Sequence, residues 1–262
     1  MELGLGVAAE PDPELLAPLA GEAEALGYVS IWSNDHYGGE GLLQLSRWAA
    51  NSHTIDLCVG VLALDRHRPS EIADRIEELG LPRTRLVLGI GAGFDSHPLA
   101  SVRSGVEELR RLLPGTRLAV AAMGPKMCRL AGEVGDAVLL NWVTPEGAPR
   151  AREAVLQGAR AVGKETTQII GYVRVAAGEG AQERLSAEAA MYTRLPHYAR
   201  HFEAMGVDPS TIGVVVEDPA TLPAQLAAYS ALDVAVVRVL SDRSMESVLV
   251  VARAAIGKDA QV

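Results

Sequence analysis

Cysteine pairs and basic clusters are both missing from this sequence, and each absence excludes a class of protein. The two cysteines, Cys58 and Cys128, cannot form a disulfide scaffold, and no CxxC pair suggests a zinc ribbon. The 24 basic side chains against 33 acidic ones leave a net charge of −9, and no Lys/Arg-rich run offers a polyanion a basic stripe. We therefore expect no metal scaffold and no nucleic-acid partner.

Long apolar runs are missing as well. None approaches the ~18 residues that span a bilayer, and the N-terminus lacks the basic start of a signal peptide. These features predict a cytoplasmic protein that acts on a small molecule and does not enter a membrane.

Core-forming residues, by contrast, are abundant. Apolar residues make up 48% of the 262 residues and charged residues 22%, which is typical of a folded globular chain. The length exceeds the usual size of one domain, but α/β barrels of about 250 residues fold as one unit. We predict a single domain over residues 1–262.

Short β-branched runs recur along the chain, each followed by a turn and an amphipathic stretch. They are continuous hydrophobic runs rather than strict alternations, which is typical of parallel strands buried on both faces. The expected strands are residues 3–8, 29–33, 55–61, 85–90, 117–122, 136–141, 168–175 and 234–240. The expected helices are 13–26, 41–51, 69–79, 98–113, 125–134, 145–162, 182–206 (divided into more than one), 219–231 and 244–256.

Eight strands alternating with helices predict an α/β fold, namely a (β/α)₈ TIM barrel. An open doubly wound sheet is the alternative, because it alternates in the same way. Its dinucleotide fingerprint fits poorly here: the glycines of GLGVAA at 4–9 lie inside a strand, and Phe94 replaces the third glycine of GIGAGF at 89–94. The barrel is therefore favoured.

The loop after the second strand carries Asp35 and His36. Side chains just beyond the strand ends line the site of a barrel, and histidine can move a proton near neutral pH. The structural alternative is a capped turn, because Asn and Asp side chains bond their own backbone. From the residues alone the two interpretations are equally weighted.

Three further turns could line the same mouth. The turn after the fifth strand, Met123-Gly124-Pro125-Lys126, combines a glycine that allows close ligand approach with a proline suited to a helix start. Gly91 and Ala92 leave almost no side chain after the fourth strand, and Asn141 follows the sixth beside Trp142. An ordinary strand–helix turn is the simpler interpretation of the 123–126 segment by itself.

The remaining reactive side chains look structural. His197 and His201 have the spacing of some zinc ligands but no third ligand, so we expect an exposed pair and no metal. Cys58 and Cys128 fall in apolar surroundings and read as inert core thiols. His67, in a strand–helix segment, is a weaker candidate for the site.

At this point the sequence resembles a known family. The segments GYVSIWSNDH, LVLGIGAG and VAAMGPKMCRLAGEVGDAVLLNW, in this order and at matching elements, are similar to the luciferase-like flavin and deazaflavin oxidoreductases (bacterial luciferase-like superfamily). The resemblance implies a (β/α)₈ barrel that binds FMN or coenzyme F420 at its C-terminal mouth. The chain looks shortened relative to the family, since the segment after the fourth strand is brief.

Carried over by the resemblance, Asp35 and His36 lie beside the coenzyme ring and orient or protonate there. Met123, Gly124 and Pro125 cover another part of the ring. Ala92 and Gly93 stand where some deazaflavin enzymes place an acid, so a general acid is missing at that point.

The favoured function is hydride transfer between coenzyme F420 and a small organic substrate. The alternatives are an FMN-dependent monooxygenase that uses reduced flavin and oxygen, and a catalytically silent flavin-binding barrel. A homodimer is possible, because family members are often dimers.

Overall fold

The computed structural model describes residues 1–10, 12–36, 39–241 and 244–258. Its strands form one closed, all-parallel ring in which β6 pairs with β7 and β9 pairs with β1. The ring runs β1-β2-β3-β4-β5-β6-β7-β9, with the bounds Glu2–Gly6, Ser30–Ser33, Asp56–Ala63, Leu86–Gly91, Arg117–Ala122, Ala137–Leu140, Gln168–Ala177 and Val234–Leu240. The closed ring confirms the predicted barrel and excludes the open sheet.

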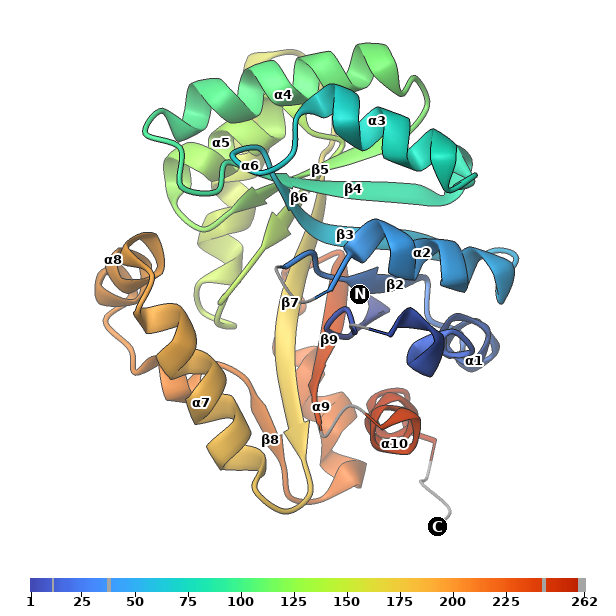
Figure 1. Cartoon of the computed structure of the whole chain (residues 1–262). Coiled ribbons are helices and arrows are strands. Elements are labelled where there is room, and N and C mark those ends of the chain that lie inside the picture. The colour runs from blue at the N-terminus through green and yellow to red at the C-terminus, as the bar shows by residue number, and fades with distance from the viewer. Residues whose placement is uncertain (11, 37–38, 242–243, 259–262) are drawn as a thin grey trace.

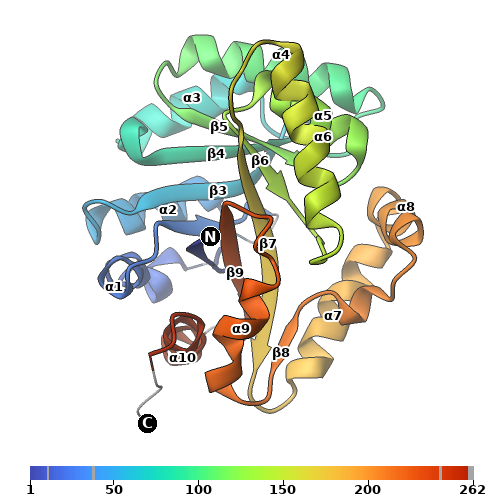
Figure 2. The same ribbon diagram turned by 180° about the vertical axis from the view of Figure 1, so that it is seen from behind.

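Helices cover the outside of this ring, as the two opposite views show (Figures 1 and 2). They are α1 Leu19–Leu26, α2 Gly41–Ala50, α3 Pro69–Glu78, α4 Pro98–Leu112, α5 Pro125–Val134, α6 Ala148–Ala161, α7 Ala181–Thr193, α8 Pro196–Met205, α9 Leu222–Ala227 and α10 Met245–Ala255. The pair α7 and α8 departs from this arrangement, because it lies to one side of the extended end of β7 (Figure 1). Among the described residues no helix is long and apolar enough to cross a membrane.

Alternate residues of each strand point to different cores. Trp32, Cys58, Tyr172 and Val236 pack together inside the ring, while their strand neighbours form the larger cluster between the ring and the helices. This two-sided burial is why the strands read as unbroken hydrophobic runs.

Two elements differ from the expectation. A ninth strand, β8 (Val214–Val216), pairs with the far end of β7. The run is too short to be distinguished from a loop by its pattern, and only the unusual length of β7 gives it a partner. The expected helix 13–26 is divided into a 3₁₀ turn, Pro13–Leu16, and α1, because Pro18 cannot continue a helical hydrogen-bond ladder.

Candidate functional site

The C-terminal ends of the ring strands meet at one mouth, because all the strands are parallel. The loops after β2, β4, β5 and β6, which carry all the predicted site residues, therefore lie at the same end of the barrel. The structure divides this mouth into two parts. The part above β1–β5 is lined by short loops, and the part above β6 and β7 is covered by α7 and α8.

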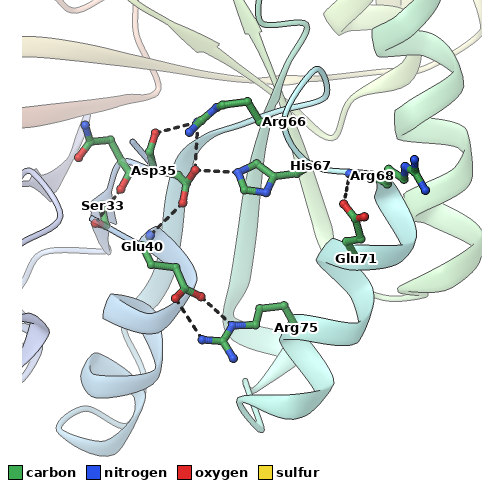
Figure 3. A network of polar contacts seen from close by, with 10 residues as sticks. Ser33, Asp35, Glu40, Arg66, His67, Arg68, Glu71 and Arg75 are labelled. Atoms are coloured by element: carbon green, nitrogen blue, oxygen red, sulfur yellow. Dashed lines mark hydrogen bonds and ion pairs between the residues drawn. The ribbon is translucent and has the colours of Figure 1, made fainter. Parts of the chain in front are cut away.

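Asp35 is the centre of a polar network in the first part (Figure 3). Its Oδ2 accepts a hydrogen bond from His67 Nε2 at 2.8 Å and pairs with Arg66 at 3.0 Å, and its Oδ1 accepts the Gly41 N–H at 3.2 Å. Its side chain is only 6% exposed. Both carboxylate oxygens are thus engaged by the protein, and a ligand would have to compete for them. The role of Asp35 beside a coenzyme stays a prediction.

A second ion pair supports this network from the surface side. Glu40 receives bonds from both Nε and Nη2 of Arg75, at 2.6 and 3.1 Å, which ties the start of α2 to α3 (Figure 3). The loops after β2 and β3 are therefore joined at two levels.

The His36 side chain contacts the loop after β1. Its Nε2 lies 3.1 Å from the Ala9 carbonyl oxygen, and since a carbonyl can only accept, Nε2 carries the proton of that bond. Asn34 Oδ1 accepts the Ala9 N–H at 2.9 Å, so the loops after β1 and β2 are bonded twice. This fixes the orientation of the imidazole at the mouth, which general acid–base chemistry requires.

Small residues form the wall between β3 and β5. Gly91 lies so close to its neighbours that a Cβ there would be 3.0 Å from Val61 Cγ2 and 3.7 Å from Ala121 Cβ. Val61 and Ala121 are both half-buried and share the inner face of the barrel. Ala92 does not belong to this wall, because its side chain is buried in the core between the ring and the helices; its contact with a coenzyme stays a prediction. Strand alternation explains this, since Ala92 follows the inward-facing Gly91.

The predicted turn 123–126 begins α5. Gly124 is the N-cap and Pro125 the first helical residue, as the sequence predicted, while Lys126 points to solvent. The backbone of Gly124 (φ −94°) does not require glycine, and a Cβ there would meet no atom within 4 Å. The space over Gly124 is thus open to an approaching ligand.

An acid from a different loop occupies the place beside Gly93. Asp65, after β3, accepts the Phe94 N–H at 2.8 Å, and its carboxylate fills the space where a side chain of Gly93 would stand. The sequence shows no acid at Ala92 or Gly93, but only the fold shows that Asp65 of the neighbouring loop lies against Gly93.

Asn141 belongs to the second part of the mouth. Its Nδ2 donates to the Tyr198 hydroxyl and its Oδ1 accepts from Arg174 Nη2, both at 3.0 Å. Arg174, only 3% exposed, also bonds Glu188 at 3.0 Å and stacks 3.4 Å above the Trp142 ring. Arg174 is not among the predicted site residues, although a charge inside the apolar run GYVRV was a signal that it has a buried partner.

Helix α8 carries the two histidines over this part of the mouth. The His197 ring meets the Phe94 ring at 5.4 Å, and His201 Nε2 donates to the Trp142 carbonyl oxygen at 3.3 Å. The prediction of an exposed pair is wrong, because both are half-buried. Burial lowers the pKa of each; at His197 the charge of Arg200 lowers it further.

Trp142 is strained where it follows β6. It adopts φ 52°, in the left-handed region that bulky residues avoid, and its buried Nε1–H has no hydrogen-bond partner among the described residues. Each such feature costs on the order of 1–3 kcal/mol, and strain of this kind collects at functional sites.

The two cysteines are buried, as the sequence predicted. Cys58 and Cys128 are buried, and burial raises the pKa of Cys128 to about 12 and that of Cys58 well above its ordinary value. Among the residues that the structure describes, no group of three His, Cys, Asp or Glu side chains could hold a metal ion.

The fold and the position of the polar groups define a (β/α)₈ barrel with its candidate site at the C-terminal mouth, as barrel enzymes have it. A model of the luciferase-like monooxygenase family matches residues 2–114 and 109–254, nearly the whole chain. The chain belongs to this family.

Two curated relatives are similar in sequence. Both are 5,10-methylenetetrahydromethanopterin reductases, from Methanolobus tindarius (27% identical over 60% of this chain) and from Archaeoglobus fulgidus (30% identical over 54%). The chain spans 60% and 53% of the length of these relatives.

Solved structures of both coenzyme types share the fold. An F420-dependent secondary alcohol dehydrogenase with an F420–acetone adduct superposes with a TM-score of 0.78 at 16% identity, over 99% of this chain and 100% of that one. The F420-dependent tetrahydromethanopterin reductase from Methanopyrus kandleri gives 0.76 at 16% identity, over 97% of each chain. The FMN-bound oxygenating component of 3,6-diketocamphane monooxygenase from Pseudomonas putida gives 0.66 at 16%, over 90% and 92%.

Proposed function

We propose that this protein transfers a hydride between coenzyme F420 and a small organic substrate at the C-terminal mouth. The observation that carries the proposal is the small-residue wall of Val61, Gly91 and Ala121 at that mouth, facing loops that hold an oriented histidine. A flat tricyclic ring needs apolar walls and close backbone approach, and both are present.

The residues present fit such a ring. No side chain stands over Gly124, and the inner wall offers only methyl groups and backbone. The two relatives that are similar in sequence are methylenetetrahydromethanopterin reductases. The tetrahydromethanopterin reductase from Methanopyrus kandleri, which shares the fold, depends on F420, and this supports F420 over FMN. When bound, F420 would supply two-electron hydride chemistry.

The chain's own residues would position the substrate and exchange a proton with it. His36, oriented through Nε2 by the Ala9 carbonyl, would exchange a proton with the substrate heteroatom next to the carbon that gains or loses hydride. Asp35, with Arg66 and His67, would hold the loop that presents His36. Met123, Gly124 and Pro125 would bound the ring on the β5 side.

Anaerobic titration with F420 and with FMN tests the proposal. We expect saturable F420 binding, and reoxidation of reduced F420 when small carbonyl compounds are added. FMN binding with oxygen-dependent consumption of reduced flavin would instead establish the monooxygenase, and tight binding without turnover on any substrate would establish the silent barrel. His36→Ala provides the inactive reference, and His53→Ala, before β3 at the opposite end of the barrel, is its matched control.

A further inference from the structure

A cavity of about 220 Å³ lies beside the mouth, between the ends of β1 and β9 and helix α7. Its walls are mostly aliphatic, with Val7, Leu16, Leu240 and Val248 among them. Four charged side chains also line it: Glu10, Arg184, Glu188 and Arg238. What the cavity can bind depends on which of these charges is already neutralised.

Three of the four are engaged within the molecule. Glu188 pairs with Arg174 at 3.0 Å, and the 8%-exposed Glu10 also has a partner. Arg184 donates to three backbone carbonyls, those of Ala177, Glu179 and Leu240. These three groups line the cavity, but their charges are already bonded within the protein and do not need a ligand.

Arg238 differs from them. It lies on the inner face of β9, two residues after the buried Val236, and is directly opposite Arg174 on β7. Its one hydrogen bond within the described part of the chain is a long one, 3.4 Å from Nη1 to the Val239 carbonyl, and no carboxylate there pairs with it. A guanidinium has five N–H donors, so most of those of Arg238 have no acceptor within the described part of the chain, and the side chain lines the cavity.

The surroundings make room for this side chain. Gly6 on β1 pairs with Arg238, and a Cβ on Gly6 would come 2.9 Å from Val236 and 3.5 Å from Arg238 Cδ. Glycine on β1 thus leaves the space through which the arginine reaches the inside of the barrel. Arg238 is half-buried there, and an arginine partly removed from water gains from an anionic partner.

We propose that Arg238 binds the acid group of the substrate, and that the substrate is a small carboxylate with an aliphatic body. The guanidinium fork matches a carboxylate in two parallel bonds, and the apolar walls accept the rest of the molecule. The assignment of Arg238 to a substrate subsite rests on the proposed function. The binding of a carboxylate by Arg238 does not depend on it.

The test uses the coenzyme-free protein, with isobutyrate as probe and the neutral isobutyramide as its isostere. Side-chain ¹⁵N NMR follows the Arg238 Nε–H signal, assigned by its absence in Arg238→Gln. We expect isobutyrate to shift this signal saturably and to bind about 10- to 100-fold more weakly to Arg238→Gln, as measured by calorimetry. Arg111→Gln, which removes an exposed arginine on α4, should bind as the wild type does.

A second variant guards against misfolding of the first. Ala8→Leu narrows the cavity and keeps Arg238, and it should also weaken isobutyrate binding. Equal binding of acid and amide, unchanged binding in both cavity variants, or no saturable binding would overturn the proposal. If F420 displaces isobutyrate from Arg238, the anion there belongs to the coenzyme and the substrate assignment is overturned.

The coenzyme titration separates this proposal from the proposed function. F420 binding without carboxylate binding removes only the anion subsite. Carboxylate binding at Arg238 without F420 binding removes only the coenzyme assignment.

Discussion

The two parts of the mouth are held together by different forces. Above β2 and β3, Asp35, Arg66 and His67 form a polar network in which hydrogen bonds and ion pairs engage both oxygens of the Asp35 carboxylate. Above β6 and β7, Trp142 is strained and lacks a partner for its N–H, and α7 and α8 cover it with aromatic rings. The first part is held by polar bonds between loops, whereas the second contains a residue in a strained conformation, a feature that collects at functional sites.

Removing the proton-transfer group should have the largest effect. His36→Ala is expected to lower turnover by about 10²–10⁴ if His36 moves the proton. Steady-state kinetics at pH 7 measures this, with His53→Ala as the control. Turnover unchanged from wild type would remove His36 from the chemistry and shift attention to the α8 side.

Breaking the buried ion pair of the covered part should affect stability most. Arg174→Leu leaves Glu188 without its partner at 14% side-chain exposure and is expected to cost about 3–5 kcal/mol of unfolding free energy. The double variant Arg174→Leu/Glu188→Leu should recover much of that loss, since no buried charge is left over. Urea denaturation measures both, and a double variant no better than the single one would contradict the assignment.

The polar network can be compared within itself. Asp35→Ala removes the carboxylate that Arg66 and His67 both contact and is expected to destabilise the fold by about 2 kcal/mol. Glu40→Ala removes a 43%-exposed partner of Arg75, so its cost should stay below about 1 kcal/mol. Equal losses in urea denaturation would show that burial does not separate the two levels.

The smallest expected effect is a difference between the two parts of the mouth in their response to pH. Burial lowers the pKa of His197 and His201 in the folded protein, so the fold favours the neutral form of both. The stability that these two histidines contribute is fully present above the pKa of an unfolded histidine, about 6.5. It is lost as the pH falls from there through their lowered pKa values. Amide exchange in α8 should therefore rise on acidification, corrected for the intrinsic rate, while that of α2 should not. The variant His197→Gln/His201→Gln should abolish the difference.

The barrel could be predicted from the sequence, because the hydrophobic period and the length of each segment distinguish strands from helices. Eight buried runs and their intervening helices predicted the closed barrel, and the Gly-Pro at 124–125 predicted the start of α5. Strand β8 was missed, since its three valines form a strand only because β7 is long enough to pair with them.

The site was harder to predict because tertiary partners decide what a polar side chain does. Asp35 is bonded to residues 31 and 32 positions further along the chain, and Arg174 is bonded to two different elements. No local pattern specifies these pairs. The spacing of the two histidines of α8 could not show their burial either, because it depends on the packing of α8 against Phe94 and Trp142.

Coenzyme titration of a blocked mouth tests the central claim most directly. Ala121→Phe places a ring against Gly91 on the inner wall, and Ala224→Phe adds the same ring on the exposed face of α9. Fluorescence titration with F420 should give saturable binding to the wild type and to Ala224→Phe, and binding at least about tenfold weaker to Ala121→Phe. Equal affinity in all three proteins, or binding of neither F420 nor FMN to the wild type, would contradict the account.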